Sequence, residues 1–190
     1  MRIPARLRER VNAKQSTFMC GGAPRKRRMN VGVAAGGGKE VYMEIRTMTI
    51  EDYEGVKNLW KSIKGFAIRS IDDSREGVER FLKRNPTASV VAVEDEKIVG
   101  SILCGHDGRR GCLYHVCVHE DYRMRGIGKS MVVHCMEALE REHINKVSLI
   151  AFTRNDIGNA FWKEIGWTKR EDLNYYDFTL NKENIVNYNK

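Results

Sequence analysis

The residue types best suited to chemistry lie in one short stretch, Arg123-Met124-Arg125-Gly126-Ile127-Gly128-Lys129. It follows an apolar, strand-like run at residues 113–118 and opens a helix-like run from Ile127 to about Glu142. Two glycines at such a turn let the backbone approach a ligand closely, because neither carries a Cβ. The first helical turn offers unpaired N–H groups and a partial positive charge, to which the three basic side chains add. The stretch predicts a phosphate site, most simply for pyrophosphate.

The elements that must position this turn follow one another in a regular order from Met43 onward. Hydrophobic periodicity, caps and turn residues predict the order β-α-α-β-β-β-α-β-α-β-β, without an internal repeat. We expect strands at 43–46, 89–94, 97–104, 113–118, 146–152, 167–169 and 175–180, and helices that open near Thr49, Asp73, Ile127 and Asn155. This order predicts a single α+β (mixed α/β) domain with a partly antiparallel sheet.

The net charge of +8 on 190 residues first suggests a nucleic-acid binder. Residues 1–42 carry that entire charge, and the rest of the chain is neutral, so no electrostatic footprint for DNA or RNA extends over the domain. The cysteines are odd in number, contain no C-x-x-C pair and occupy apolar positions, as reduced intracellular cysteines do. No apolar run reaches the roughly 18 residues of a membrane span. We therefore expect a cytoplasmic protein without membrane or nucleic-acid partners.

Residues 1–42 differ from the rest, with a basic cluster at 25–28, a glycine run at 36–38 and no sustained periodicity. A disordered basic tail, a nucleic-acid arm and untranslated sequence are the three interpretations. The third is favoured, because Lys39-Glu40-Val41-Tyr42-Met43 can be encoded by a purine-rich ribosome-binding signal followed by ATG. The hypothesis places the natural start at Met43 and the domain at 43–190.

Two motifs in this order resemble the GNAT superfamily of acyl-CoA-dependent N-acetyltransferases, over essentially all of 43–190. The signature Q/R-x-x-G-x-G/A stands here as Arg123 to Gly128. A second motif, an Asn that opens a helix ending in aromatic-x-x-x-Gly-aromatic, stands at Asn155 and residues 161–167. Two ordered motifs are far more specific than one glycine motif alone. Residues 84–86 and 105–111 further resemble a YpeA-type bacterial subgroup.

The resemblance implies a six- to seven-stranded, mostly antiparallel sheet with helices on both faces, whose fourth and fifth strands splay apart to admit the pantetheine arm of acetyl-CoA. It places Val116, Cys117 and Val118 along that arm, paired through backbone groups. The pyrophosphate would lie on the amides of residues 125–129. Asn155 would reach the pantetheine from the other side. The implied cofactor set is Val116, Cys117, Val118, Arg123, Arg125, Gly126, Ile127, Gly128, Lys129 and Asn155.

The implied reaction is direct attack of an amine on the thioester, which requires a neutral amine and therefore a base. The candidates beside the splay are His115 and Tyr114, and a packed strand histidine is the equally weighted alternative for His115. Many family members have a Tyr acid where this chain has Trp162, whose indole cannot donate a proton as an acid. Either Tyr175 or Tyr176 replaces it, or the thiolate leaves unassisted.

The acceptor side of the site has weaker signals. His106 and Asp107 lie in a turn that could border the acceptor, although ordinary turn chemistry accounts for both. Asp73, Arg84 and Asn85 are further candidates, and Asp73 is also explained as a helix cap. Residues 115, 117 and 119 alternate His, Cys and His, but no fourth ligand at suitable spacing is evident, so we expect no metal.

Three functions remain open from the sequence, beside a nucleic-acid binder that is the weakest alternative because it rests on residues 1–42 alone. The first is an acetyltransferase that acts on a small-molecule amine, and the second is one that acts on a protein N-terminus or Lys. The third is a catalytically weak acyl-CoA-binding module, favoured by the missing Tyr at Trp162. A homodimer is compatible with all three.

Overall fold

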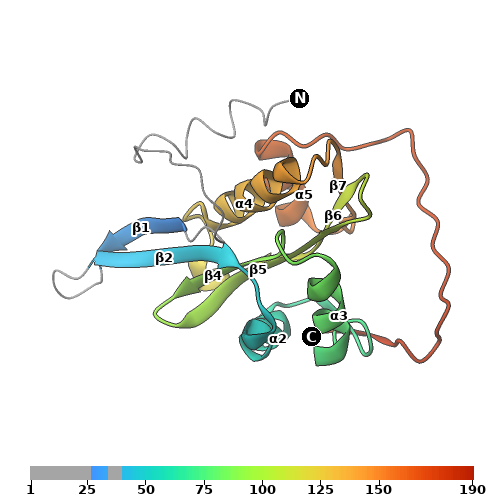
Figure 1. Ribbon diagram of the computed structural model, residues 1–190, viewed down its shortest axis with the longest axis horizontal. Coiled ribbons are helices and arrows are strands. Elements are labelled where there is room, and N and C mark those ends of the chain that lie inside the picture. The colour runs from blue at the N-terminus through green and yellow to red at the C-terminus, as the bar shows by residue number, and fades with distance from the viewer. Residues whose placement is uncertain (1–26, 34–39) are drawn as a thin grey trace.

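A computed structural model describes residues 27–33 and 40–190 of the protein (Figure 1). Its main sheet has six strands in the order β1-β2-β4-β5-β6-β7, and every neighbouring pair is antiparallel except β6 with β7. The strands are β1 (Arg27–Val33), β2 (Glu40–Thr47), β4 (Val90–Glu94), β5 (Lys97–His106), β6 (Gly111–Val118) and β7 (Val147–Leu149). The predicted mixed, mostly antiparallel sheet of an α+β domain is confirmed.

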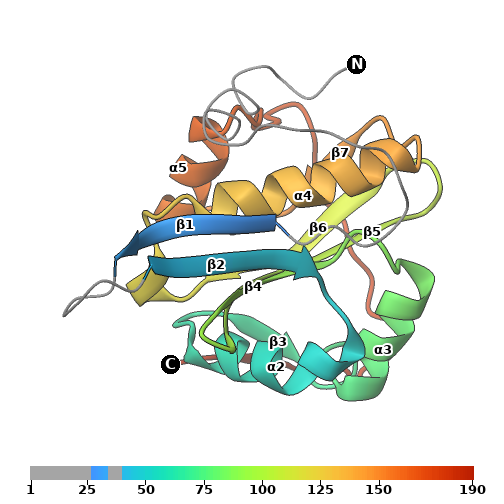
Figure 2. The same cartoon turned by 60° about the vertical axis from the view of Figure 1, so that its left-hand side comes forward.

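Helices cover both faces of this sheet, as Figure 2 shows. One face carries α2 (Tyr53–Ser62) and α3 (Arg75–Arg84), and the other carries α4 (Ile127–Arg141) and α5 (Asp156–Glu164). Two short 3-10 helices, η1 (Ile50–Asp52) and η2 (Glu120–Tyr122), precede α2 and the glycine-rich turn. Within the described ranges, no helix is both long and apolar enough to span a bilayer.

Alternating side chains of the central strands divide the core in two. Val90 and Ala92 pack with α4, whereas Val91 packs with α2, because successive strand residues face opposite sides. On the α2 side the fully buried Trp60 donates its indole N–H to Ser101 Oγ at 3.0 Å. Both faces of the sheet are thus fixed by packing, and the strand ends keep a defined position.

The predicted start of the first helix is also confirmed. Thr49 and Asp52 form a capping box, in which the Asp52 carboxylate accepts the Thr49 N–H at 2.9 Å. Arg46 donates two further hydrogen bonds to that carboxylate, at 2.6 and 2.7 Å, and so ties η1 to the end of β2.

The two predicted closing strands are wrong. Residues 167–169 and 175–180 form no strand, and the chain instead ends in a two-stranded sheet of β3 (Ala67–Arg69) and β8 (Val186–Tyr188). The alternating apolar pattern that suggested a strand faces solvent, since Tyr176, Phe178 and Leu180 are 85%, 87% and 93% exposed. The pattern was therefore not the signature of a half-buried strand.

The sheet also begins earlier than expected. Strand β1 lies inside the segment for which we expected no regular structure, and β2 begins at Glu40 rather than Met43. Backbone pairing explains this, because Met29 lies opposite Met43 in an antiparallel ladder. Residues 1–26 and 34–39, with Cys20 and part of the basic cluster, lie outside the described residues. The start at Met43 stays a prediction, which the codons for residues 39–42 test.

His134 makes the stability of this fold depend on pH. It is 5% exposed on α4, and burial, followed by the charges of Arg27 and Arg141, lowers its pKa to about 4. Between pH 6.5 and pH 4 the unfolded chain therefore binds a proton at this residue that the folded chain does not. The free energy of unfolding should fall by roughly 3 kcal/mol as pH drops through this window.

Urea unfolding of His134→Leu and the parent protein across this window isolates the effect, because other titrating groups are common to both. The variant should lose less stability on acidification. Parallel curves for the two proteins would contradict the assignment.

Candidate active site

The site begins where β6 and β7 part. These strands pair from Gly111 with Val147 to Leu113 with Leu149, and no further pair is formed. β6 continues to Val118, paired only with β5, while the chain beyond β7 leaves the sheet and exposes Ile150 by 65%. The second half of β6 thus has no strand on one side within the described residues. The predicted splay of fourth and fifth strands is present.

The glycine-rich turn lies at the end of this opening. Gly126 is the N-cap of α4, with φ +77° in the left-handed region and no side-chain cap. A Cβ there would meet nothing within 4 Å, so the residue borders open space. Helix geometry leaves the first amides of α4, at Ile127, Gly128 and Lys129, without intrahelical acceptors. The turn therefore presents free N–H groups beside the unpaired edge of β6, and free N–H groups at a helix start are suited to bind an anion.

The other residues of the motif build the turn. Gly128 lies against the Phe161 ring of α5, because a Cβ on Gly128 would be 3.4 Å from that ring, in van der Waals contact. Arg123 donates to the Val118 carbonyl at 3.1 Å. Arg125 donates to the Asp121 carbonyl at 3.1 Å and lies 3.5 Å from a Glu94 oxygen. Both arginine side chains thus help to hold the loop in place. The Lys129 side chain makes no hydrogen bond or ion pair with a described residue.

Helix α5 borders the far side of the opening. Asn155 is its N-cap, and its side-chain oxygen accepts the Gly158 N–H at 2.9 Å, so only its NH₂ group remains for a ligand. Trp162, the residue in place of Tyr, packs against Phe161 and Trp167 with ring centroids 4.9 Å from each. Trp162 thus belongs to the packing between α5 and the core.

His115 lies at an irregularity of β6 and faces the helices α2 and α3. Its φ of +49° accompanies a register shift in the pairing with β5, a β-bulge. The imidazole contacts the rings of Trp60 and Phe66, with centroids at 4.6 and 5.0 Å, and Tyr114 contacts Phe81 at 6.0 Å. The bulge therefore turns two consecutive side chains, Tyr114 and His115, to the same face of the sheet.

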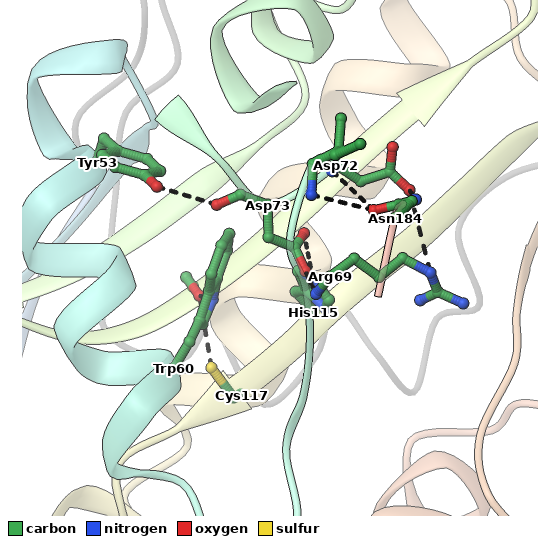
Figure 3. A network of polar contacts seen from close by, with 10 residues as sticks. Tyr53, Trp60, Arg69, Asp72, Asp73, His115, Cys117 and Asn184 are labelled. Carbon is green, nitrogen blue, oxygen red and sulfur yellow. Dashed lines mark hydrogen bonds and ion pairs between the residues drawn. The ribbon is translucent and has the colours of Figure 1, made fainter. Parts of the chain in front are cut away.

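The partner of His115 is Asp73, as Figure 3 shows. The Nε2 atom of His115 lies 2.7 Å from Asp73 Oδ1, and Asp73 is 5% exposed. The other carboxylate oxygen accepts the Arg69 N–H at 2.6 Å. Nδ1 of His115 makes no hydrogen bond to a described residue and is not among their fully buried unpartnered atoms, so it keeps some exposure in a side chain that is 16% exposed. Such a pair can hold an imidazole with Nδ1 ready to accept a proton.

The loop that carries Asp73 is held by the C-terminal segment. Asn184 Oδ1 accepts the N–H groups of Ile71 and Asp72 at 3.1 and 3.3 Å, and its NH₂ group donates to the Asp72 carboxylate at 2.6 Å (Figure 3). The side chain of Ser70 links the same loop to Glu183 and Ile185. Helix α3 has Ser74 as its N-cap, which accepts the Gly77 N–H, so the cap interpretation of Asp73 is wrong.

Four of the five predicted substrate residues, together with Tyr114, line one cavity of about 340 Å³. They are Arg84, Asn85, His106 and Asp107, and Asp73 does not line this cavity. Burial and the neighbouring Cys112 raise the pKa of Tyr114 to about 12, so its phenol stays protonated at neutral pH and is no base. Burial likewise raises the pKa of Cys117 to about 11, which leaves an inert thiol in the strand.

Sequence reasoning missed the pairing that organises this site. It placed His115 and Asp73 in separate roles, because 42 residues separate them. It missed Asn184 entirely, which no local signal marks in a polar C-terminal stretch. Tyr175, a proposed acid, is 67% exposed on the segment before β8. No group of three or more His, Cys, Asp or Glu that could hold a metal occurs among the residues the structure describes.

Comparison with known proteins agrees with this geometry. A model of the acetyltransferase (GNAT) family matches residues 52–167. An acetyltransferase of Sodalis glossinidius is 30% identical over 69% of this chain and 91% of its own length. One of Pectobacterium atrosepticum is 34% identical over 60% of this chain and 79% of its own length.

Two solved structures show the same fold. The PaiA N-acetyltransferase of Thermoplasma acidophilum, in complex with coenzyme A, has a TM-score of 0.60 at 16% identity, over 76% of this chain and 96% of that one. An aminoglycoside N-acetyltransferase in complex with CoA has a TM-score of 0.56 at 16% identity, over 77% of this chain and 99% of that one.

Replacing Asn184 by Ala should loosen the loop that carries Asp73. The variant removes the acceptor shared by the Ile71 and Asp72 amides, so both should exchange hydrogen faster, by about tenfold for each 1.4 kcal/mol of lost stabilisation. Hydrogen exchange followed by mass spectrometry over residues 69–74 measures the change.

Asn187→Ala is the matched control, because Asn187 is exposed on β8 and its side chain has no partner among the described residues. Equal exchange in both variants would show that Asn184 does not hold the loop.

Proposed function

The chain belongs to the GNAT family of acetyltransferases, and we propose that it transfers the acetyl group of acetyl-CoA directly to the amine of a small-molecule acceptor. The observation that carries this proposal is the meeting of two features at one place. Where β6 and β7 part, the unpaired backbone of β6 can form hydrogen bonds with the amide groups of a pantetheine arm. At the start of α4, which has no side-chain cap at Gly126, free N–H groups can bind a diphosphate.

For acetyl-CoA, we assign the backbone of Val116, Cys117 and Val118 to the pantetheine arm. The amides of residues 127–129 receive the pyrophosphate, and the Lys129 ammonium adds charge there. Arg123 and Arg125 act mainly by bracing the turn, since both already bind carbonyl groups nearby. The NH₂ group of Asn155 faces the pantetheine from α5.

The acceptor amine must lose a proton before it attacks. An alkylammonium with a pKa near 10.4 is neutral in only about one molecule in 2,500 at pH 7, which corresponds to about 4.6 kcal/mol of activation. We assign the general base to His115, whose Nδ1 is open, and a positioning role to Asp73, which holds Nε2–H. The ammonium proton passes to Nδ1, and the neutral nitrogen then forms the new bond to the acetyl carbon. The second proton on that nitrogen is lost from the tetrahedral intermediate to the departing thiolate or to water.

The tetrahedral intermediate collapses by breaking the carbon–sulfur bond. We assign the stabilisation of the oxyanion to a backbone N–H near Val118. A thiol with a pKa near 8.5 leaves as a thiolate far more readily than an amine does, so no strong acid is required. Unassisted departure fits a site in which Trp162 is packed and Tyr175 is exposed.

Thiol release from acetyl-CoA in the presence of fractionated metabolite extract is the direct test of this function. A fraction that releases thiol identifies an acceptor class, whereas acetyl label recovered only on proteins would favour a protein acceptor. Binding of acetyl-CoA without release by either source would favour a binding module.

Replacing Gly126 by Asp should abolish binding of CoA while the domain stays folded. The new carboxylate would face the pyrophosphate, and opposed like charges cost several kcal/mol, so affinity should fall by at least about 100-fold. Calorimetry with free CoA measures the loss.

Gly65→Asp is a close control, because Gly65 has φ +72° and also borders open space, but lies between α2 and β3. Backbone strain is thus similar in both variants. Normal CoA affinity in Gly126→Asp, or equal losses in both variants, would overturn the assignment.

Replacing His115 by Gln should lower kcat by about 10²- to 10⁴-fold, the usual contribution of a general base, and leave the affinity for CoA unchanged. Steady-state rates with the acceptor fraction, together with CoA calorimetry, separate the two effects. Asp73→Asn should give a smaller loss of kcat, because it affects orientation rather than the proton acceptor.

His143→Gln serves as the control, since His143 is exposed beyond α4 and its side chain makes no hydrogen bond or ion pair with a described residue. A kcat for His115→Gln within about twofold of the parent value would exclude His115 as the base.

A further inference from the structure

The cavity beside Tyr114 has a distinctive set of polar groups. It lies between the last turn of α3, with Phe81 and Arg84, and the hairpin that joins β5 to β6. Gly105 lets these elements approach, because a Cβ there would come within 2.8 Å of Phe81 and Asn85. The cavity thus lies on the same face of the sheet as His115.

Most polar side chains in the wall of this cavity already form hydrogen bonds or ion pairs within the protein. Asn85 accepts the His106 N–H at 2.9 Å and donates to the Phe81 carbonyl. His106 accepts the Gly108 N–H through Nδ1, and its Nε2 lies 2.8 Å from a carboxylate oxygen of Glu142. These residues shape the cavity, and few of their hydrogen-bonding groups remain available for a ligand.

Asp107 is committed in the same way. One of its carboxylate oxygens accepts the N–H groups of Arg109 and Arg110, each at 2.7 Å, and these bonds lower the pKa of Asp107. It therefore closes the turn as an ionised carboxylate. The hydrogen bonds of the turn account for the presence of Asp107, whose carboxylate places one negative charge at the rim of the cavity.

Two guanidinium groups remain without a partner. Neither the Arg84 nor the Arg110 side chain makes a hydrogen bond or ion pair with any residue that the structure describes, and both line the cavity. The two arginines carry one positive charge more than Asp107 can balance, so the lining of the cavity has an excess positive charge that favours a further anion. Guanidinium groups also bind carboxylate and phosphate with two parallel hydrogen bonds.

We propose that this cavity binds the acceptor through an anionic group, a carboxylate or a phosphate, held by Arg84 and Arg110, with the amine directed to His115. The proposal rests on the acetyltransferase function proposed above and specifies its substrate class. The rings of Phe81 and Tyr114 form an apolar wall between the two ends.

The fold sets the length of such an acceptor. Arg110 precedes β6 and His115 lies within it, and a strand advances about 3.3 Å per residue. The anion and the amine are thus separated by roughly 10 Å once the reach of the arginine side chain is considered. A small ω-amino acid or ω-amino phosphate fits this span and a cavity of about 340 Å³, whereas an α-amino acid does not span it.

The test uses matched amines. Turnover is measured with 6-aminohexanoate, its amide and 6-aminohexyl phosphate, for the parent protein, Arg84→Gln and Arg110→Gln. The parent protein should prefer one of the anionic amines to the amide by about tenfold in kcat/KM, and each variant should lose most of that preference through KM. A higher kcat/KM for 6-aminohexanoate would indicate a carboxylate acceptor, and a higher kcat/KM for 6-aminohexyl phosphate would indicate a phosphate acceptor.

The controls remove the same charge outside the cavity. Arg80→Gln lies one helical turn from Arg84, and Arg109→Gln lies beside Arg110, and neither residue lines the cavity. Both should keep the parent preference. Loss of preference in all four variants would indicate a general charge effect and overturn the proposal, as would equal use of acid and amide.

A binding measurement separates this proposal from the proposed function. Calorimetry with 6-acetamidohexanoate and 6-acetamidohexyl phosphate, which mimic the acetylated products, does not require turnover. Binding that is weakened about tenfold in Arg84→Gln and Arg110→Gln supports the anion site even if no amine is acetylated, and in that case only the proposed function fails. Absence of binding of both compounds at millimolar concentration overturns the anion site, whether or not turnover occurs.

Discussion

The parting of β6 and β7 is the constraint on which the rest of the structure depends. Three residue pairs join these strands, and β6 then continues without a neighbour on that side in the described chain. Unpaired backbone N–H and C=O groups beside a sheet are unfavourable unless a ligand or water satisfies them. The sheet tolerates the opening because packing fixes each strand from both faces, with Met131 of α4 on one side and Trp60 of α2 on the other.

The two faces of the sheet carry different parts of the candidate site. On the α4 side, the left-handed Gly126 starts a helix whose first amides face the opening. On the α2 side, the bulge at His115 rotates the imidazole toward Asp73 and keeps Tyr114 at the wall of the cavity. One irregularity in one strand therefore places an imidazole and one wall of the cavity on the same face of the sheet, close to the point where the strands part.

Local sequence signals predicted the parts of the site that are local in the chain. The glycine turn, the start of α4 and the Asn155 cap follow from short motifs whose physics operates within a few residues. The contact of His115 with Asp73 spans 42 residues and that of Asn184 with Asp72 spans 112, so no periodicity or spacing encodes them. The closing strands failed because alternation of apolar residues at 175–180 does not reveal whether a sheet edge covers them.

The tie between the C-terminal segment and the Asp73 loop has a consequence for synthesis of the protein. Asn184 is synthesised 113 residues after Ile71, whose N–H it binds, and Asn189 is synthesised 129 residues after Trp60, whose carbonyl it binds together with that of Ile63 at the end of α2. A nascent chain can thus assemble its main sheet and its glycine-rich turn before the loop that carries Asp73, the partner of His115, is held in place. Changes within residues 183–189 would therefore alter the position of His115, although they lie about 70 residues further along the chain.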